Sequence, residues 1–351
     1  MRPEQWAVFK RAARLERLER VPMALIVDSP WIPGYLGVKH MDYFLDPELW
    51  FQANRRIYEE YPQIIFVPSW WMEYGMAAEP SALGTKIKFW PDNTPSAYHT
   101  LRRIEDIEEF PEYEAEADAF MGMTLHRIRM QRQRILDLGE VLPLATSRGP
   151  LCTAAFVRGT TELMIDLVEK PEWAHRLIDL CTRLVIDWLK AEAKALGDGV
   201  EGIFILDDIV GFINEEHYRE FAHPYLQRIC QAFPREWVKI YHNDADISAC
   251  LDHLPDCGFH VLNWGKQTDI AEVKARVGDR MCLMGNVNPL EIGVRGTPEE
   301  VREATREVLD KSGGEGIILS VGGGTSPGMP RQNILAMLGA LEEFNARRAT
   351  S

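Results

Sequence analysis

The chain has 351 residues, and 46% of them are hydrophobic, so a large core can form without disulfides or bound metals. A formal net charge of −14, with no Lys/Arg cluster to reverse it locally, argues against nucleic acid or an anionic membrane as a partner. Residues 1–20 alternate charged and apolar side chains, and no apolar run reaches the ~20 residues that span a bilayer. We therefore expect a cytoplasmic protein with no membrane association.

Eight short apolar runs, separated by longer segments of helical period, are typical of a parallel α/β fold. They cover residues 21–27, 64–68, 141–145, 202–206, 238–241, 260–263, 281–284 and 316–320. Eight repeats favour a single (β/α)8 barrel domain spanning residues 1–351, although the count alone leaves a doubly wound sheet open. Residues 1–20 are predicted to form an amphipathic helix before the first strand.

The predicted helices follow the later strands and carry recognisable start signals. Asn214 precedes two glutamates, and Thr297 is followed by proline and two glutamates, as at helix N-termini. The helical segments are residues 172–196, 215–232, 246–254, 268–276, 297–311 and 331–344. Residues 72–113 fit the alternation least, and we predict that they form an insertion after the second strand that covers the barrel mouth.

Six scattered cysteines show no C-x-x-C pair and no disulfide-like spacing. In a reducing compartment most of them are expected to be small buried hydrophobes. Chemistry is therefore sought elsewhere, among the polar residues that follow nearly every predicted strand. These are Asp28-Ser29, residues 69–73 and 147–149, Asp207-Asp208, residues 242–244 and 263–265, Asn286, Asn288 and residues 322–325.

In a barrel all of these residues reach one rim, where barrel enzymes place their active sites. His242 and Asp244 give the sharpest local signal, because residues two apart at a strand end point to the same side and can bind one metal or share one proton. Such a pair equally forms to satisfy buried polar groups. Asp207 and Asp208 end another apolar run, so one carboxylate is expected to act as acid, base or ligand, unless it caps a helix or pairs with Arg148.

The three glycines Gly322, Gly323 and Gly324 resemble a backbone cradle for an anion, or make room for a large ligand, or form a simple turn. Trp70, Trp71 and Trp264 are predicted to supply flat apolar walls around the mouth. Because adjacent tryptophans cannot both point inward along a strand, we expect one of Trp70 and Trp71 to meet a ligand, a partner or the insertion.

The chain resembles the uroporphyrinogen decarboxylase superfamily from Arg20 to Ile334. The matching pieces are residues 79–86, residues 148–151, Asp207-Asp208 with Pro224-Tyr225, the His242 strand end, residues 284–289, and residues 322–324 before Pro330. The resemblance implies a (β/α)8 barrel, in agreement with the strand count. True decarboxylases of the family carry an arginine-rich segment after strand one, whereas residues 27–37 contain no arginine. The resemblance therefore disfavours porphyrinogen decarboxylation.

The other branch of the family contains corrinoid-dependent methyltransferases. Members that act on thiols, such as methylcobalamin:coenzyme M methyltransferases, bind zinc through an H-x-C pair and a cysteine in the glycine-rich turn. Here the first ligand is retained as His242, the second becomes Asp244 and the third falls at Gly323. Loss of the thiolates argues against a thiol acceptor and favours a harder oxygen-and-nitrogen site.

From this resemblance we predict methyl transfer from a small methoxylated, aromatic donor to cobalamin on a separate corrinoid carrier protein. His242 and Asp244 would hold zinc or a proton as the metal and catalytic residues, with Asp207 or Glu73 orienting them. The substrate-binding residues would be Trp70, Trp71, Arg148, Asp208, Trp264 and Asn286, and Gly322, Gly323 and Gly324 would leave space for the corrin.

Three alternatives remain open at this point. The first is a decarboxylase or lyase in which Asp207 donates a proton and Arg148 binds a carboxylate, and the second is transfer from methylcobalamin to an acceptor. The third is a non-catalytic ligand-binding barrel, which the loss of two zinc ligands supports and the density of charged rim residues opposes. The sequence leaves a homodimer open as the assembly.

Overall fold

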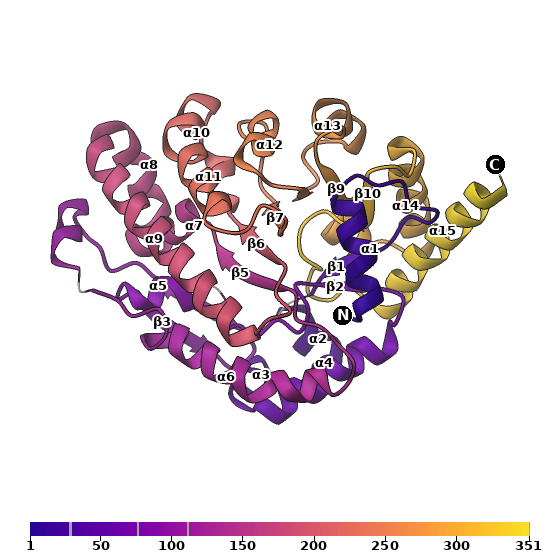
Figure 1. The fold of residues 1–351 in the computed structure, drawn as a ribbon, viewed down its shortest axis with the longest axis horizontal. Helices are drawn as coiled ribbons and strands as arrows, with labels where there is room; N and C mark the ends of the chain where they lie inside the picture. Colours follow the sequence, from indigo (N-terminus) through magenta and orange to yellow (C-terminus); the bar gives the residue numbers. More distant parts are fainter. Residues whose placement is uncertain (28–29, 76, 111, 351) are drawn as a thin grey trace.

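The eight predicted barrel strands all form in a computed structural model that describes residues 1–27, 30–75, 77–110 and 112–350. They are β1 (Ala24–Ile26), β2 (Ile65–Val67), β5 (Leu144–Arg148), β6 (Gly202–Leu206), β7 (Val238–Asn243), β8 (Val261–Trp264), β9 (Cys282–Val287) and β10 (Ile317–Val321). The bounds of β6 are those predicted, whereas β5 begins and ends three residues later than predicted and so includes Ser147 and Arg148. The fold is a (β/α)8 barrel with helices outside the strands (Figure 1).

The strands pair in parallel and in chain order. Strands β5 to β10 form one six-stranded sheet, and β1 pairs with β2. The two sheets meet where Met23 bridges to Leu319 just before β1, and the Leu319 N–H donates to Pro22 O at 2.9 Å. This order brings the carboxyl ends of all eight strands to one rim.

The junction between β2 and β5 is different, because side chains take the place of strand pairing among the described residues. On the β5 edge, Glu192 accepts the Thr146 N–H, Glu79 accepts the Arg148 N–H at 2.7 Å, and Trp188 Nε1 donates to Thr146 O at 2.9 Å. A small cavity of about 20 Å³ lies along this seam and is lined by these side chains and by Trp71. On the edge that faces β2, the backbone polar groups of β5 are thus satisfied by helix side chains rather than by a neighbouring strand.

Helices cover the outside of the barrel, and their start signals behave as predicted. Asn214 accepts the His217 N–H, and Thr297 forms a capping box with Glu300. The helices that follow the strands are α2 (Trp31–Leu36), α3 (His40–Leu45), α4 (Pro47–Glu60), α6 (Ala119–Leu136), α7 (Pro150–Arg158), α8 (Thr160–Glu169), α9 (Pro171–Leu196), η2 (Asp208–Phe212), α10 (Glu215–Phe221), α11 (His223–Gln231), η3 (Leu251–His253), α12 (Leu254–Cys257), α13 (Ile270–Val277), η4 (Pro289–Val294), α14 (Pro298–Ser312) and α15 (Arg331–Thr350).

Two helix predictions were wrong in detail. Residues 215–232 form two helices, since α10 ends at Phe221 and α11 begins at His223. The predicted helix over 246–254 is replaced by turns and the short elements η3 and α12. All six cysteines are buried and unpaired, as predicted, and no helix of the described residues is long and apolar enough to cross a membrane.

The insertion after β2 contains α5 (Ala78–Ala82), an antiparallel hairpin of β3 (Lys86–Trp90) and β4 (Asn93–Tyr98), and the short helix η1 (Ile104–Glu109). The hairpin packs on the outer helices, where the ring of Phe89 contacts those of Phe44 and Phe120. Figure 1 places β3 at the edge of the molecule beside α5 and α6. The prediction that this segment covers the mouth is therefore wrong for the hairpin, which extends the helical layer.

The inside of the barrel is a separate apolar cluster, formed by every second residue of the strands. Phe204 and Leu206 of β6, Val238 and Ile240 of β7, and Val261 of β8 belong to it. Helix α1 (Pro3–Ala13) contributes Trp6, Phe9, Ala12 and Ala13 to the same cluster, so the amphipathic helix predicted near the start packs against the barrel interior (Figure 1). This inward set fixes which strand-end residues project into the mouth.

Candidate functional site

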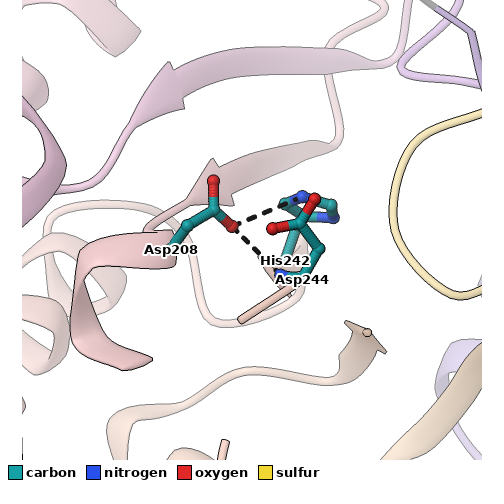
Figure 2. A group of neighbouring side chains, drawn as sticks. All are labelled: Asp208, His242 and Asp244. Carbon is teal, nitrogen blue, oxygen red and sulfur yellow. Dashed lines mark hydrogen bonds and ion pairs between the residues drawn. The ribbon is translucent and has the colours of Figure 1, made fainter. Parts of the chain in front are cut away.

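Three side chains from the ends of β6 and β7 meet at the barrel mouth (Figure 2). Asp208, His242 and Asp244 each offer one ligand atom, and these atoms lie within 4.8 Å of one another. His242 Nε2 is 3.6 Å from Asp208 Oδ1, which also accepts the backbone N–H of Asp244 at 3.1 Å. A tetrahedral metal ion with bonds of ~2.0–2.1 Å separates its ligand atoms by about 3.3 Å, so the three residues can close on one cation with small adjustments.

The three residues of the triad differ in their exposure to solvent. His242 is buried, with its ring edge against Phe204, whereas Asp208 is partly exposed and Asp244 lies at the open rim. Desolvation of its carboxyl and the negative charge of Asp208 raise the pKa of Asp244, while His242 opposes the shift. Two carboxylates this close repel each other unless a proton or a cation lies between them.

Asp207, predicted as catalytic, does not join the triad. Its carboxylate points outward from β6 and accepts the N–H groups of Leu151 at 3.2 Å and Cys152 at 2.8 Å, in the first turn of α7. Burial raises its pKa to about 8, against the effect of the two N–H donors. The catalytic prediction for Asp207 is therefore replaced by a structural role as a helix cap, and Asp208 takes the place in the mouth.

Arg148 and Glu73 lie together in the seam between β2 and β5. Their side chains approach to 3.9 Å, and both are buried. Burial disfavours the charged form of Arg148, but Glu73 and Glu79 outweigh this effect and raise its pKa. The guanidinium lies 5.5 Å from the ring centroid of Trp71. Arg148 is thus already balanced by neighbouring carboxylates and is a poor anchor for the carboxylate of a substrate.

Of the three tryptophans predicted to line the mouth, one faces the barrel interior and two lie in the core between the strands and the outer helices. Trp71 packs toward the barrel interior, with its ring 6.2 Å from that of Phe204. Trp70 points the opposite way and stacks with Phe51 at 5.3 Å in the outer core. Trp264 is also fully buried in the outer core. The predicted ligand contacts of Trp70 and Trp264 are corrected accordingly, and Trp71 is the one of the three that faces the barrel interior.

Alanine substitutions of Trp70 and Trp71 are expected to have different consequences. Trp70→Ala should reduce the free energy of unfolding by roughly 3–5 kcal/mol, because it leaves a large cavity in a packed aromatic cluster. Trp71→Ala should cost clearly less, because its side chain is only partly buried. Urea denaturation of the two variants measures the difference, and equal losses would contradict the inner and outer placement.

The glycine-rich turn after β10 lies against the triad. Gly323 adopts φ +101°, and a Cβ atom there would be 3.0 Å from the Cβ of Asp244. Gly322 similarly brings the chain close to Trp264 O, and Gly324 follows in the same turn. Asn286 donates to Thr268 O at 3.0 Å and lies at the end of β9, outside the triad. The predicted rim residues Asp28 and Ser29 lie outside the described residues.

Gly323→Ala should clearly destabilise the protein, because Gly323 is buried against the triad. The positive φ and the contact with Asp244 both oppose a side chain, and such strain costs on the order of 1–3 kcal/mol. Gly199→Ala is the matched control, because a Cβ atom there meets nothing within 4 Å and its φ is not positive. Thermal denaturation of the two variants compares them, and a Gly323→Ala protein as stable as the control would refute the close approach.

Asn263, which the strand-end pattern grouped with other rim residues, contacts the triad directly. Its side chain points inward from β8, and its Oδ1 lies 2.7 Å from His242 Nδ1. The register pairs His242 with Asn263 on adjacent strands. Counting inward positions from Val261 would have placed Asn263 beside His242 once the inner face was known.

Comparisons with known proteins agree with this architecture. The family model described as uroporphyrinogen decarboxylase matches residues 7–344. A uroporphyrinogen decarboxylase from Methylococcus capsulatus is 25% identical, with 96% of this chain and 97% of that protein covered. One from Pseudoalteromonas translucida is also 25% identical, over 76% of each chain.

Solved structures share the fold at lower identity. A methyltransferase from Methanosarcina mazei superposes with a TM-score of 0.81 at 20% identity, covering 96% of this chain and 97% of that one. A B12-independent methionine synthase from Shewanella gives a TM-score of 0.57 at 12% identity, over 86% and 88% of the chains. These likenesses concern the fold, whereas the family match extends over almost the whole sequence. The chain belongs to the uroporphyrinogen decarboxylase family.

Proposed function

We propose that this protein is a corrinoid-dependent methyltransferase that takes a methyl group from a small methoxylated, aromatic donor and passes it to cobalamin on a separate carrier protein. The observation that carries the proposal is the Asp208–His242–Asp244 triad at the barrel mouth. Its single nitrogen and two carboxylates form a set of donor atoms with no thiolate. Such a set suits a cation that activates oxygen rather than sulfur.

The triad fits a divalent cation such as zinc, both by the spacing of its atoms and by its charge. A bound cation would relieve the repulsion between Asp208 and Asp244 and complete its coordination with the donor's ether oxygen, for which it would act as a Lewis acid. In the absence of a cation the same two carboxylates can hold one proton between them. Either arrangement would place an electrophile at the mouth, a cation in the first case and an acidic proton in the second.

The reaction moves a methyl group without its bonding electrons. Reduced Co(I) of the carrier supplies the electron pair for the new Co–C bond, and the C–O bond breaks with its pair remaining on oxygen. Asp208, His242 and Asp244 would hold the cation or the proton at that oxygen. With a cation, the leaving group would depart as a charge-compensated phenolate and take a proton from water; with a proton, it would depart as the phenol. We infer that Trp71, the tryptophan that packs toward the barrel interior, contacts the aromatic ring of the donor.

Decarboxylation is the second candidate, because the curated relatives named above are uroporphyrinogen decarboxylases. Two contacts weigh against it here. Asp207, the proton donor in that mechanism, caps α7, and Arg148, its carboxylate anchor, is balanced by Glu73 and Glu79. The triad proposed for methyl transfer is not used in such capping or pairing, and its Asp244 lies at the open rim.

The proposal is tested by incubating the protein with free cob(I)alamin, or with a corrinoid carrier protein reduced to Co(I), and a panel of methoxybenzoates and methoxyphenols. The expected result is the absorbance of methylated Co(III) together with one equivalent of the demethylated phenol. Because Arg148 is already paired, uncharged methoxyphenols should react faster than methoxybenzoates. A parallel incubation with coproporphyrinogen and uroporphyrinogen checks the second candidate. Release of CO₂ without any methyl transfer would overturn the proposal.

Metal affinity should increase with pH across the acidic range. The pKa of Asp244 is raised, so its carboxyl still binds a proton at pH values where a free aspartate is ionised, and a metal ion must displace that proton. The metal-free protein should show the opposite trend, losing stability as the pH rises through this range, because its folded state binds more protons than its unfolded state. Calorimetric titration with Zn²⁺ in buffers of different ionisation enthalpy measures the proton released, and a pH-independent affinity would contradict the prediction.

A further inference from the structure

The side chain of Asn263 has only one orientation that satisfies its neighbours. One end of its amide lies 2.7 Å from Met284 O and 3.1 Å from Val321 O, and the other end lies 2.7 Å from His242 Nδ1. Backbone carbonyls only accept hydrogen bonds, so the end that faces them must be the NH₂ group. The opposite orientation would set the amide oxygen against two carbonyl oxygens. The Oδ1 atom therefore faces the imidazole.

This orientation decides where His242 carries its proton. Oδ1 can only accept, so His242 Nδ1 must donate, and in the neutral ring the lone pair then resides on Nε2. Nε2 is the atom that faces Asp208 Oδ1 at 3.6 Å. Asn263 and His242 are both buried, so no bulk water competes for Nδ1. The lone pair is thus directed into the triad before any ligand arrives.

We propose that Asn263 is a positioning residue, which locks His242 as the Nδ1–H tautomer and so presents Nε2 to whatever cation the triad binds. The importance of this lock for the reaction rests on the proposed function, but the tautomer is a property of the protein alone. Neighbours of a metal-binding histidine commonly contribute 10- to 100-fold to metal affinity in this way. The two carbonyls that hold Asn263 come from β9 and β10. Three adjacent strands, β8 to β10, therefore determine which nitrogen of His242 carries the proton.

The tautomer is read directly by ¹⁵N NMR of the metal-free, full-length protein with labelled histidine, at about pH 8, where an ordinary histidine is neutral. Comparison with His242→Gln identifies the signals of His242. The expected spectrum has a pyrrole-type Nδ1 and a pyridine-type Nε2. In Asn263→Leu both nitrogens should move toward the values of a mixed population, and the affinity for Co²⁺, followed by its visible absorbance, should fall 10- to 100-fold.

Asn333→Leu is the matched control. Asn333 is equally buried and likewise donates to two backbone carbonyls, Gly293 O and Gly296 O, but it lies on α15. This variant should lose comparable stability and leave the His242 signals and Co²⁺ affinity unchanged. A protonated Nε2 in the wild-type protein would overturn the proposal even if Asn263→Leu failed to fold, as would unchanged signals in a folded Asn263→Leu protein. If no metal binds the wild type, the metal site of the proposed function fails, whereas the spectrum still decides the tautomer.

Discussion

His242→Ala is expected to eliminate stoichiometric metal binding and to reduce methyl transfer by roughly 10²–10⁴-fold, the range typical of losing acid or Lewis-acid assistance to a leaving group. The residue supplies the only nitrogen of the triad, and without it two neighbouring carboxylates remain as ligands. Elemental analysis of the purified variant measures the metal content, and the appearance of methylated Co(III) measures the rate. The two readouts should fall together.

His260→Ala separates this effect from a general cost of removing a histidine. The ring of His260 accepts the Lys239 N–H beside the beginning of β7, at the end of the barrel away from the mouth. This control should retain metal and activity. A metal-free His242→Ala protein that still transfers methyl groups at the wild-type rate would refute the role of the triad.

Alanine substitutions at the adjacent residues Asp207 and Asp208 should affect different properties. Asp207→Ala should lower the stability of the fold, whereas Asp208→Ala should abolish metal binding. Asp207→Ala leaves two N–H groups of α7 without an acceptor in a buried position, where each unsatisfied donor costs about 1–3 kcal/mol. We expect it to lower the free energy of unfolding by about 2–4 kcal/mol. Asp208→Ala removes a partly exposed carboxylate that repels Asp244, so stability should change by less than about 1 kcal/mol, while metal binding is lost.

The pair is best measured by urea denaturation and metal analysis on the same preparations. Gly149→Ala should reproduce the effect of Asp207→Ala on stability, because a Cβ atom there would lie 2.2 Å from Asp207 Oδ2. An Asp207→Ala protein that is stable but inactive would instead return Asp207 to the catalytic role predicted from the sequence. If the Asp208→Ala protein retained metal, Asp208 would not be one of the ligands.

The sequence predicted all eight barrel strands because each is a short apolar run between helical segments. It could not say which side chains face inward. Parallel barrel strands are buried on both faces. In a run such as residues 202–206, the side chains that face inward and those that face outward are therefore both apolar, and the alternation of polar and apolar residues that would tell them apart is missing. Which of Asp207 and Asp208, and which of Trp70 and Trp71, faces the barrel interior could therefore not be predicted from the sequence.

His242 and Asp244 were predicted together because a separation of two residues gives the same side whatever the phase. Asp208 and Asn263 come from other strands, and their contact with His242 depends on the register between strands, which no local pattern encodes. The resemblance to methyltransferases placed a lost cysteine at Gly323, and this residue does lie beside Asp244. The third donor of the triad nevertheless comes from β6 instead of that turn.

The seam between β2 and β5 makes one joint of the barrel more compliant than the others. The strand pairs within each of the two sheets are joined by backbone ladders, which break only cooperatively, and β10 meets β1 through a backbone bridge between Met23 and Leu319. The β2–β5 joint depends instead on a few long side chains that can change rotamer one at a time. The Thr146 and Arg148 amides should therefore exchange with solvent deuterium sooner than those of β6 to β9. Opening there would widen the mouth beside Trp71 and Arg148 and leave His242 fixed. The barrel could in this way admit donors of different widths while its reactive centre stays rigid.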